Sequence, residues 1–312
     1  MSPASERVSL ILAFSCLAGL AIAPQVSGKQ STQTRRLLTP EQLEILGHLS
    51  IEFLDDGQGG LAKTIRVNGT NLQVVNGSGT SNNANGVGNL IVGYNELRGS
   101  GDNRVGSHNI VGGRKNNYAK WGGLVVGTLN SITGSWSSIS GGHNNVSNDS
   151  WSSVSGGTEN IAGGPDASVS GGKDNIASGP GSSVSGGIGN YATGYYSSVT
   201  GGVNNRATDL GATVSGGGFN TASGNTSSVS GGFAGYSSSG FSSISGGRYG
   251  QATSSWASVS GGTNNTASGP HSSVSGGSNN TAAGLYSSIG GGTERNVGGN
   301  HDWAAGSLFE DN

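Results

Sequence analysis

A single apolar residue returns at a fixed interval through most of the chain. It lies within a Ser-Ser-Val-Ser-Gly-Gly unit and recurs every 15 residues without a slip. A fixed period of this kind is typical of a repeat protein, in which each unit packs only on its neighbours. The recurring positions are Ile139, Val154, Val169, Val184, Val199, Val214, Val229, Ile244, Val259, Val274 and Ile289. Less regular units precede them at 90–93, 110–113 and 124–127, with a loop around 98–103 that absorbs extra residues.

Alternation within the unit predicts which side chains point inward. If Val154 faces the interior, then Ser152 and Gly156 also face inward, while Ser153 and Ser155 face outward. A second pattern, Asn-x-Ala, begins six residues after the valine, and only its middle residue varies widely from repeat to repeat. Asn and Ala are therefore expected to face inward around an outward residue. Each repeat then has two short strands across a thin core, with the Gly pair at one turn and a further Gly at the other.

This pattern predicts an all-β fold, a parallel β-roll or β-solenoid with 15-residue coils. About fourteen coils at roughly 4.8 Å each would give a rod of about 65 Å. The repeat domain is expected at 86–292, followed by a C-terminal cap at 293–312. Because the core of each coil is small, association into an oligomer is expected to add stability.

Other repeat architectures fit the sequence less well. Hexapeptide helices need 18 residues per coil, and pentapeptide helices would place an apolar residue every five positions. Calcium-binding rolls need aspartates in register, whereas the aspartates of the repeats do not stack from coil to coil.

The N-terminal segment has a different organisation. Residues 1–28 resemble a signal peptide, with a basic residue before an apolar stretch and cleavage expected after Gly28. A lipoprotein modification at Cys16 and a retained membrane anchor are the alternatives. Residues 29–85 are expected to form a linker, a short helix at 40–49 that begins with a capping box, and a hairpin cap that pairs 65–67 with 72–75.

Composition and charge narrow the possible functions. The chain has 61 Gly among 312 residues, 10% charged residues and a net charge of −2. Its basic residues form no stripe, so no nucleic-acid partner is expected. The Gly pairs lack the following Lys-Ser/Thr and helix of a phosphate-binding loop. The five His lie at unrelated phases of the repeat, and His271 is expected to be a solvated turn residue. No catalytic residue, metal site or small-molecule cofactor is predicted.

Aromatic residues recur at or near one turn of successive coils and are the candidate surface-binding residues. Rows of this kind can stack on sugars, which suggests a surface polysaccharide as partner. The competing interpretation is that the rings pack on neighbouring coils or line a subunit interface. The residues are Trp136, Trp151, Tyr195, Tyr196, Phe241, Trp256 and Tyr286.

The units at 88–93 and 153–157 resemble the head repeats of trimeric autotransporter adhesins, the YadA-like heads. The chain is also similar to Ser-Val-Ser-Gly-Gly repeat proteins of environmental bacteria, on 38–43, 55–59 and 303–308. The first resemblance implies a left-handed roll, a homotrimer and an adhesive role. The chain shows no coiled-coil stalk or membrane barrel, so autotransport is not expected.

The leading hypothesis is a non-enzymatic structural or adhesive protein, secreted by a bacterium and attached at the cell surface or in the extracellular matrix. One alternative is an ice- or mineral-binding solenoid that uses the outward Ser face. The other is a polysaccharide-active β-helix enzyme.

Overall fold

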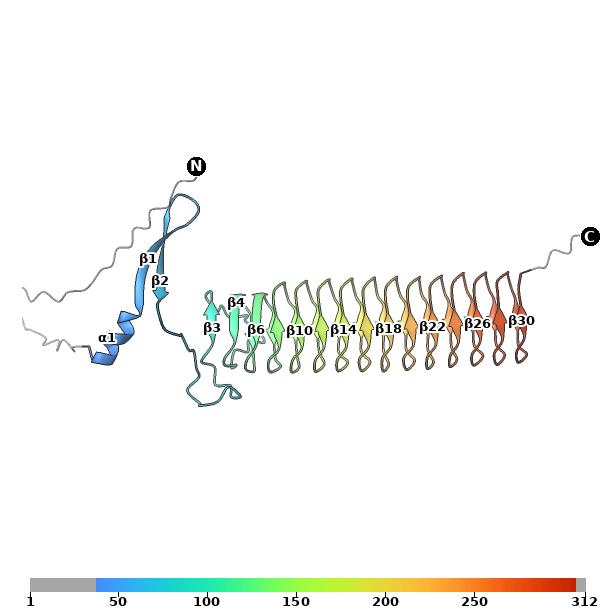
Figure 1. The fold of residues 1–312 in the computed structure, drawn as a ribbon, viewed down its shortest axis with the longest axis horizontal. Helices are drawn as coiled ribbons and strands as arrows, with labels where there is room; N and C mark the ends of the chain where they lie inside the picture. The colour runs from blue at the N-terminus through green and yellow to red at the C-terminus, as the bar shows by residue number, and fades with distance from the viewer. Residues whose placement is uncertain (1–37, 307–312) are drawn as a thin grey trace, which may run out of the picture. The chain divides into compact units, whose positions relative to one another are not determined.

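The computed structural model describes residues 38–306 and divides the chain into two units, 1–73 and 74–312. The expected signal peptide at 1–28 lies outside the described residues. Within 38–306, no helix is both long and apolar enough to cross a membrane. Figure 1 shows the helix and hairpin of the first unit and the stack of coils of the second.

The first unit contains one helix and one antiparallel hairpin. Helix α1 (Pro40–Gly47) begins with the expected capping box, in which Thr39 and Gln42 each accept the other's backbone N–H. The prediction of a short helix here is confirmed, although it ends two residues before 49. Strands β1 (Leu49–Asp55) and β2 (Leu61–Val67) pair along their full length.

The predicted pairing of 65–67 with 72–75 is wrong. Residues 65–67 pair with 49–51 instead, and 72–75 lie outside any strand. The physical reason lies in the turn between β1 and β2, where Asp56 accepts the backbone N–H groups of Gln58 and Gly60. This turn allows seven residues to pair on each side. The predicted hairpin of 65–67 with 72–75 would pair only three residues of one strand with four of the other.

The second unit is a parallel β-solenoid, as the 15-residue period predicts. Two sheets face each other, and every strand pairs in parallel with the equivalent strand one coil away. The first sheet contains β3 (Leu90–Val92), β4 (Ile110–Arg114), β6 (Leu124–Thr128), β8 (Ser138–Ile139), β10 (Ser153–Val154), β12 (Ser168–Val169), β14 (Ser183–Val184), β16 (Ser198–Val199), β18 (Thr213–Val214), β20 (Ser228–Val229), β22 (Ser243–Ile244), β24 (Ser258–Val259), β26 (Ser273–Val274), β28 (Ser288–Ile289) and β30 (Trp303–Ala304).

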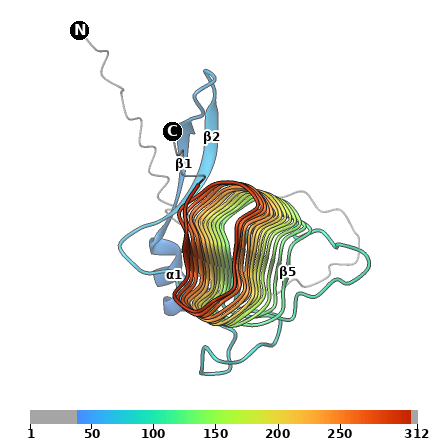
Figure 2. The same ribbon diagram turned by 90° about the vertical axis from the view of Figure 1, so that its right-hand side faces the viewer.

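The second sheet of the solenoid has 13 strands, which sets the number of coils near thirteen. Viewed along the axis, successive coils nearly superpose (Figure 2). Both sheets continue past residue 292, so the repeat domain is longer than predicted. The strands are β5 (Asn117–Tyr118), β7 (Ser131–Ile132), β9 (Val146–Ser147), β11 (Ile161–Ala162), β13 (Ile176–Ala177), β15 (Tyr191–Ala192), β17 (Arg206–Ala207), β19 (Thr221–Ala222), β21 (Tyr236–Ser237), β23 (Gln251–Ala252), β25 (Thr266–Ala267), β27 (Thr281–Ala282) and β29 (Asn296–Val297).

The alternation predicted for the repeat is confirmed at all but one position. Val154, Ser152, Asn160 and Ala162 are buried, and each is at most 1% exposed. Gly156 is the exception, because a Cβ built there would meet no atom within 4 Å. The first Gly of the pair therefore faces open space rather than the interior. The chain has already left the strand at this point, so the two-residue alternation no longer applies.

A column of buried asparagines connects the coils. The Asn175 side chain accepts the N–H of Asn190 at 3.0 Å and donates to the carbonyls of Gly171 and Gly187, both at 2.9 Å. Equivalent bonds recur at Asn145, Asn160, Asn190, Asn205, Asn220 and Asn280. This asparagine column satisfies polar groups that a dry interior would otherwise leave unpaired.

The asparagine column is interrupted in two consecutive coils. Gly235 and Gly250 occupy the asparagine position there. A Cβ at Gly235 would lie 3.5 Å from Ile244, and one at Gly250 would lie 3.6 Å from it. The larger side chain of Ile244 thus lies beside the space that the missing side chains leave.

Candidate functional site

The most regular surface of the solenoid lies on the first sheet. Within residues 138–276 it consists of three parallel rows that run from coil to coil. The rows that begin at Ser138 and Ser140 contain only Ser and Thr, and the row that begins at Gly141 contains only Gly. The first row is half-buried and the second is exposed. We call these three rows the Ser–Gly face.

The two glycines of each pair differ in their surroundings. At the second position, Gly187 has φ +88°, and a Cβ there would lie 2.2 Å from the carbonyl oxygen of Gly202 in the next coil. Only glycine fits this position. At the first position, Gly186 has an ordinary φ, and a Cβ would meet nothing within 4 Å. The fold of a single chain therefore explains the second glycine but not the first.

The candidate aromatic residues lie along one turn of the solenoid. Six of the seven belong to one row, spaced 15 residues apart from Trp136 to His301, in which every residue has a positive φ. We call this the aromatic row. Tyr195 lies beside it and meets Tyr196 edge-on, with ring centroids 4.4 Å apart. All seven candidates are 43–62% exposed.

The structure brings these residues into two stacks and one pair. Trp136 and Trp151 stack with centroids 5.4 Å apart and planes 8° apart. A longer stack begins at Phe241 and Trp256, whose centroids are 4.2 Å apart, and continues through His271, Tyr286 and His301. Neighbouring ring planes in the stacks lie within 18° of parallel, so each ring packs on the ring of the next coil. This arrangement agrees with the interpretation that the rings pack on neighbouring coils.

Two histidines of the long stack were missed as site residues. His271 lies between Trp256 and Tyr286, with centroid separations of 6.1 Å and 4.7 Å, and His301 stacks on Tyr286 at 5.2 Å. The expectation that His271 is merely a solvated turn residue is therefore incomplete. The expectation that the five His lie at unrelated phases of the repeat is wrong for these two. His271 and His301 are 30 residues apart and continue the 15-residue spacing from Phe241, so the signal was present in the sequence.

A second aromatic cluster occupies the opposite turn and was not predicted. Phe233 contacts Phe219 and Tyr249, with centroid separations of 5.4 Å and 5.9 Å. The Arg248 guanidinium lies 5.6 Å from the ring of Phe233 and 5.4 Å from that of Tyr249. A cation over exposed aromatic rings adds a modest attraction. We call these four residues the opposite-turn cluster.

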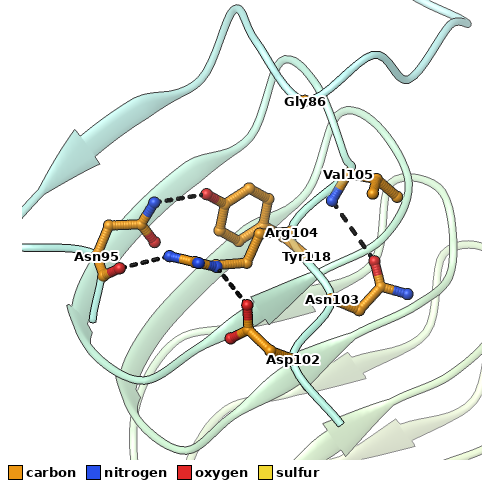
Figure 3. Close-up of a pocket in the computed structure, with 7 residues that line it drawn as sticks. All are labelled: Gly86, Asn95, Asp102, Asn103, Arg104, Val105 and Tyr118. Atoms are coloured by element: carbon orange, nitrogen blue, oxygen red, sulfur yellow. Dashed lines mark hydrogen bonds and ion pairs between the residues drawn. The ribbon is translucent and has the colours of Figure 1, made fainter. Parts of the chain in front are cut away.

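A concavity of about 630 Å³ lies at the first coils of the solenoid (Figure 3). Arg104 pairs with Asp102 at 2.9 Å and donates to the backbone carbonyl of Asn95. The Asn95 amide in turn donates to the Tyr118 hydroxyl at 3.0 Å. These polar groups are engaged with one another, so the cluster braces an irregular 20-residue coil and offers few free groups to a ligand.

Arg98 extends this brace along the axis. Its guanidinium donates to the backbone carbonyls of Lys115, Leu129 and Asn130, and its backbone N–H donates to Asp102 at 3.0 Å. Burial lowers the pKa of the guanidinium, and the nearby Asp102 carboxylate opposes that change. One side chain thus links carbonyl groups from two successive turns of the chain.

The structure places few charged groups together outside this brace. Lys173 lies 3.8 Å from Glu159 and 3.7 Å from Asp174 on exposed turn positions, a geometry of little energetic weight. A side-chain hydrogen bond with Tyr195 raises the pKa of Tyr196, and the electrostatic effect of the nearby Tyr195 hydroxyl acts in the same direction. Among residues 38–306, no three His, Cys, Asp or Glu side chains lie close enough to hold a metal ion.

No protein-family model matches the sequence, and a search of curated proteins gives no significant match.

Proposed function

We propose that this protein is a secreted, non-enzymatic structural or adhesive solenoid that attaches a bacterium to a surface or to the polysaccharides of an extracellular matrix. The N-terminal apolar stretch supports secretion. The resemblance to adhesin heads supports self-association and implies three copies. The observation that carries the adhesive role is the aromatic row, because it presents half-exposed rings in two runs of successive coils, from Trp136 to Trp151 and from Phe241 to His301.

The backbone conformation of the aromatic row strengthens this argument. Bulky residues rarely adopt a positive φ, which costs about 1–2 kcal/mol for most side chains. Other coils place Asp166, Gly181 or Gly211 at the same position. Aromatic residues are therefore not required for the turn. Stacking offsets part of the cost, and contact with an external surface would explain why large rings occupy so exposed a position.

Binding to insoluble polysaccharides and to cell envelopes tests this proposal. The purified mature chain should sediment with at least one of these materials. Replacing Trp136 and Trp151 by Asn, which tolerates a positive φ, should reduce the bound fraction at least about tenfold. The matched control is Phe219→Asn, a substitution of the same kind on the opposite turn. No binding by the wild-type chain, or equal loss in the control, would reject the adhesive role of this row.

A second candidate function is binding to ice or to a mineral lattice. The specific observation is the Ser–Gly face, whose two hydroxyl rows repeat in register at every coil. Strand spacing places these hydroxyls about 4.8 Å apart along the axis. Ice recrystallisation and thermal hysteresis assays test it directly. Crystals that grow as in buffer alone would remove this candidate.

A further inference from the structure

The first glycine of each pair is unexplained within a single chain. Ten successive coils carry it, at Gly141, Gly156, Gly171, Gly186, Gly201, Gly216, Gly231, Gly246, Gly261 and Gly276. None has a positive φ, and a Cβ at any of them would meet no atom within 4 Å. Glycine loses more backbone freedom on folding than any other residue, so its repetition here needs a cause.

The outward row of the other sheet shows which side chains an exposed position of this solenoid tolerates. The outward row of the second sheet holds Ile176, Tyr191, Arg206, Thr221 and Gln251, among others. Side chains of every size and charge are therefore compatible with an exposed row of this solenoid. The Ser–Gly face, in contrast, holds only Ser, Thr and Gly over ten coils. Its small side chains point to a requirement that comes from outside the chain.

We propose that the Ser–Gly face packs against the same face of a second copy of this chain. The requirement repeats at every coil, so the partner surface must repeat with the same period. Among the described surfaces, this face itself is the one that keeps a single composition at that period. A face that meets itself forms a two-fold contact, in which the same three rows are buried on both copies. Small residues allow two sheets to approach closely and interdigitate.

The available area is sufficient for such a contact. Ten coils at about 4.8 Å and four residues at about 3.3 Å give a face of about 45 Å by 13 Å. Each copy would then bury about 600 Å², or about 1,200 Å² in total, which reaches the size of a specific interface. The three rows contain no charged residue within 138–276, so no like charges would meet.

This inference rests on the self-association included in the proposed function, but it gives two copies where the resemblance to adhesin heads implies three, and the mass of the protein in solution decides between them. Light scattering after size exclusion should give two copies for the wild-type mature chain. Replacing Gly171, Gly186 and Gly201 by Gln should give one copy and raise the dissociation constant at least about 100-fold. The ordinary φ and open space at these positions mean that each coil can keep its fold, and far-UV circular dichroism should be unchanged.

The matched control places the same side chain on the opposite sheet. Thr221, Thr266 and Thr281 are replaced by Gln in a row where Gln251 already occurs, and this variant should remain paired. A wild-type mass of one or three copies would overturn the face-to-face pair, as would a glycine variant that stays paired. A single-copy protein that still binds polysaccharide would leave the proposed function standing, so the two failures are distinguishable.

Discussion

The asparagine column offers a sharp test of what holds the coils together. In the variant Asn175→Ala, the backbone N–H of Asn190 loses its hydrogen-bond partner, and so does the carbonyl of Gly171. The carbonyl of Gly187 keeps a bond from the N–H of Lys173 at 3.0 Å. Two polar groups therefore remain unpaired at the edge of a dry interior.

The magnitude follows from these two groups. Leaving one buried donor or acceptor unpaired costs about 1–3 kcal/mol, so the variant should lose about 4 kcal/mol of stability. Urea unfolding followed by far-UV circular dichroism measures this loss. Because each coil contacts only its neighbours, the defect should also split or broaden the transition. Hydrogen exchange should show the Asn190 amide exchanging faster than amides several coils away.

An amide on the outside of the same sheet provides the control. Gln251 is exposed on β23, so Gln251→Ala should change stability by no more than about 0.5 kcal/mol. If Asn175→Ala unfolds at the wild-type urea concentration and the Asn190 amide stays protected, the asparagine column is not a major source of stability. Backbone pairing and valine burial would then have to account for the cohesion.

Three further predictions concern other parts of the solenoid. Gly187→Ala should cost more than about 2 kcal/mol, because its Cβ would overlap the next coil's carbonyl oxygen, whereas Gly186→Ala should leave the melting temperature nearly unchanged. Arg98→Ala should remove about 2–3 kcal/mol and increase hydrogen exchange in the first coils only, because three backbone carbonyls lose a charged donor. Absorbance at 295 nm should show Tyr196 titrating above its usual value of 10.0, and Tyr195→Phe should lower that pKa. Because the folded-state pKa is raised, this tyrosine's contribution to stability is present below pH 10 and is lost as pH rises through the folded-state value.

The 15-residue period was sufficient to predict the coil, its register and the inward Val, Asn and Ala positions. Because the period is constant, each residue can pair in register only with the residue 15 positions away. Alternation within a strand then assigns each side chain to the inner or the outer face. The orientation of Gly156 could not be derived this way, because alternation holds only while the chain is extended. The predicted number of about fourteen coils is close to the thirteen that the second sheet gives. The continuation of both sheets past residue 292 was missed, because β29 and β30 lack the Ser-Val-Ser-Gly-Gly unit.

The hairpin of the first unit was missed for a related reason. The helix was expected to extend to 49, although 49–55 pairs as a strand along its whole length. A short apolar run fits both periods, and only a partner decides between them. The aromatic stacks were partly predictable, since spacing placed the rings at successive coils. Their stacking geometry depends on side-chain rotation about a positive-φ backbone, which the sequence pattern does not encode.

The interruption of the asparagine column has a mechanical consequence. A force that pulls along the solenoid axis is carried in parallel by the strand ladders and by the asparagine side chains that connect successive coils. At Gly235 and Gly250 the side-chain contribution is missing, so two adjacent junctions carry the load on backbone hydrogen bonds and packing alone. Under tension the solenoid should yield there first, which would separate it into a longer and a shorter segment that each keep an intact column.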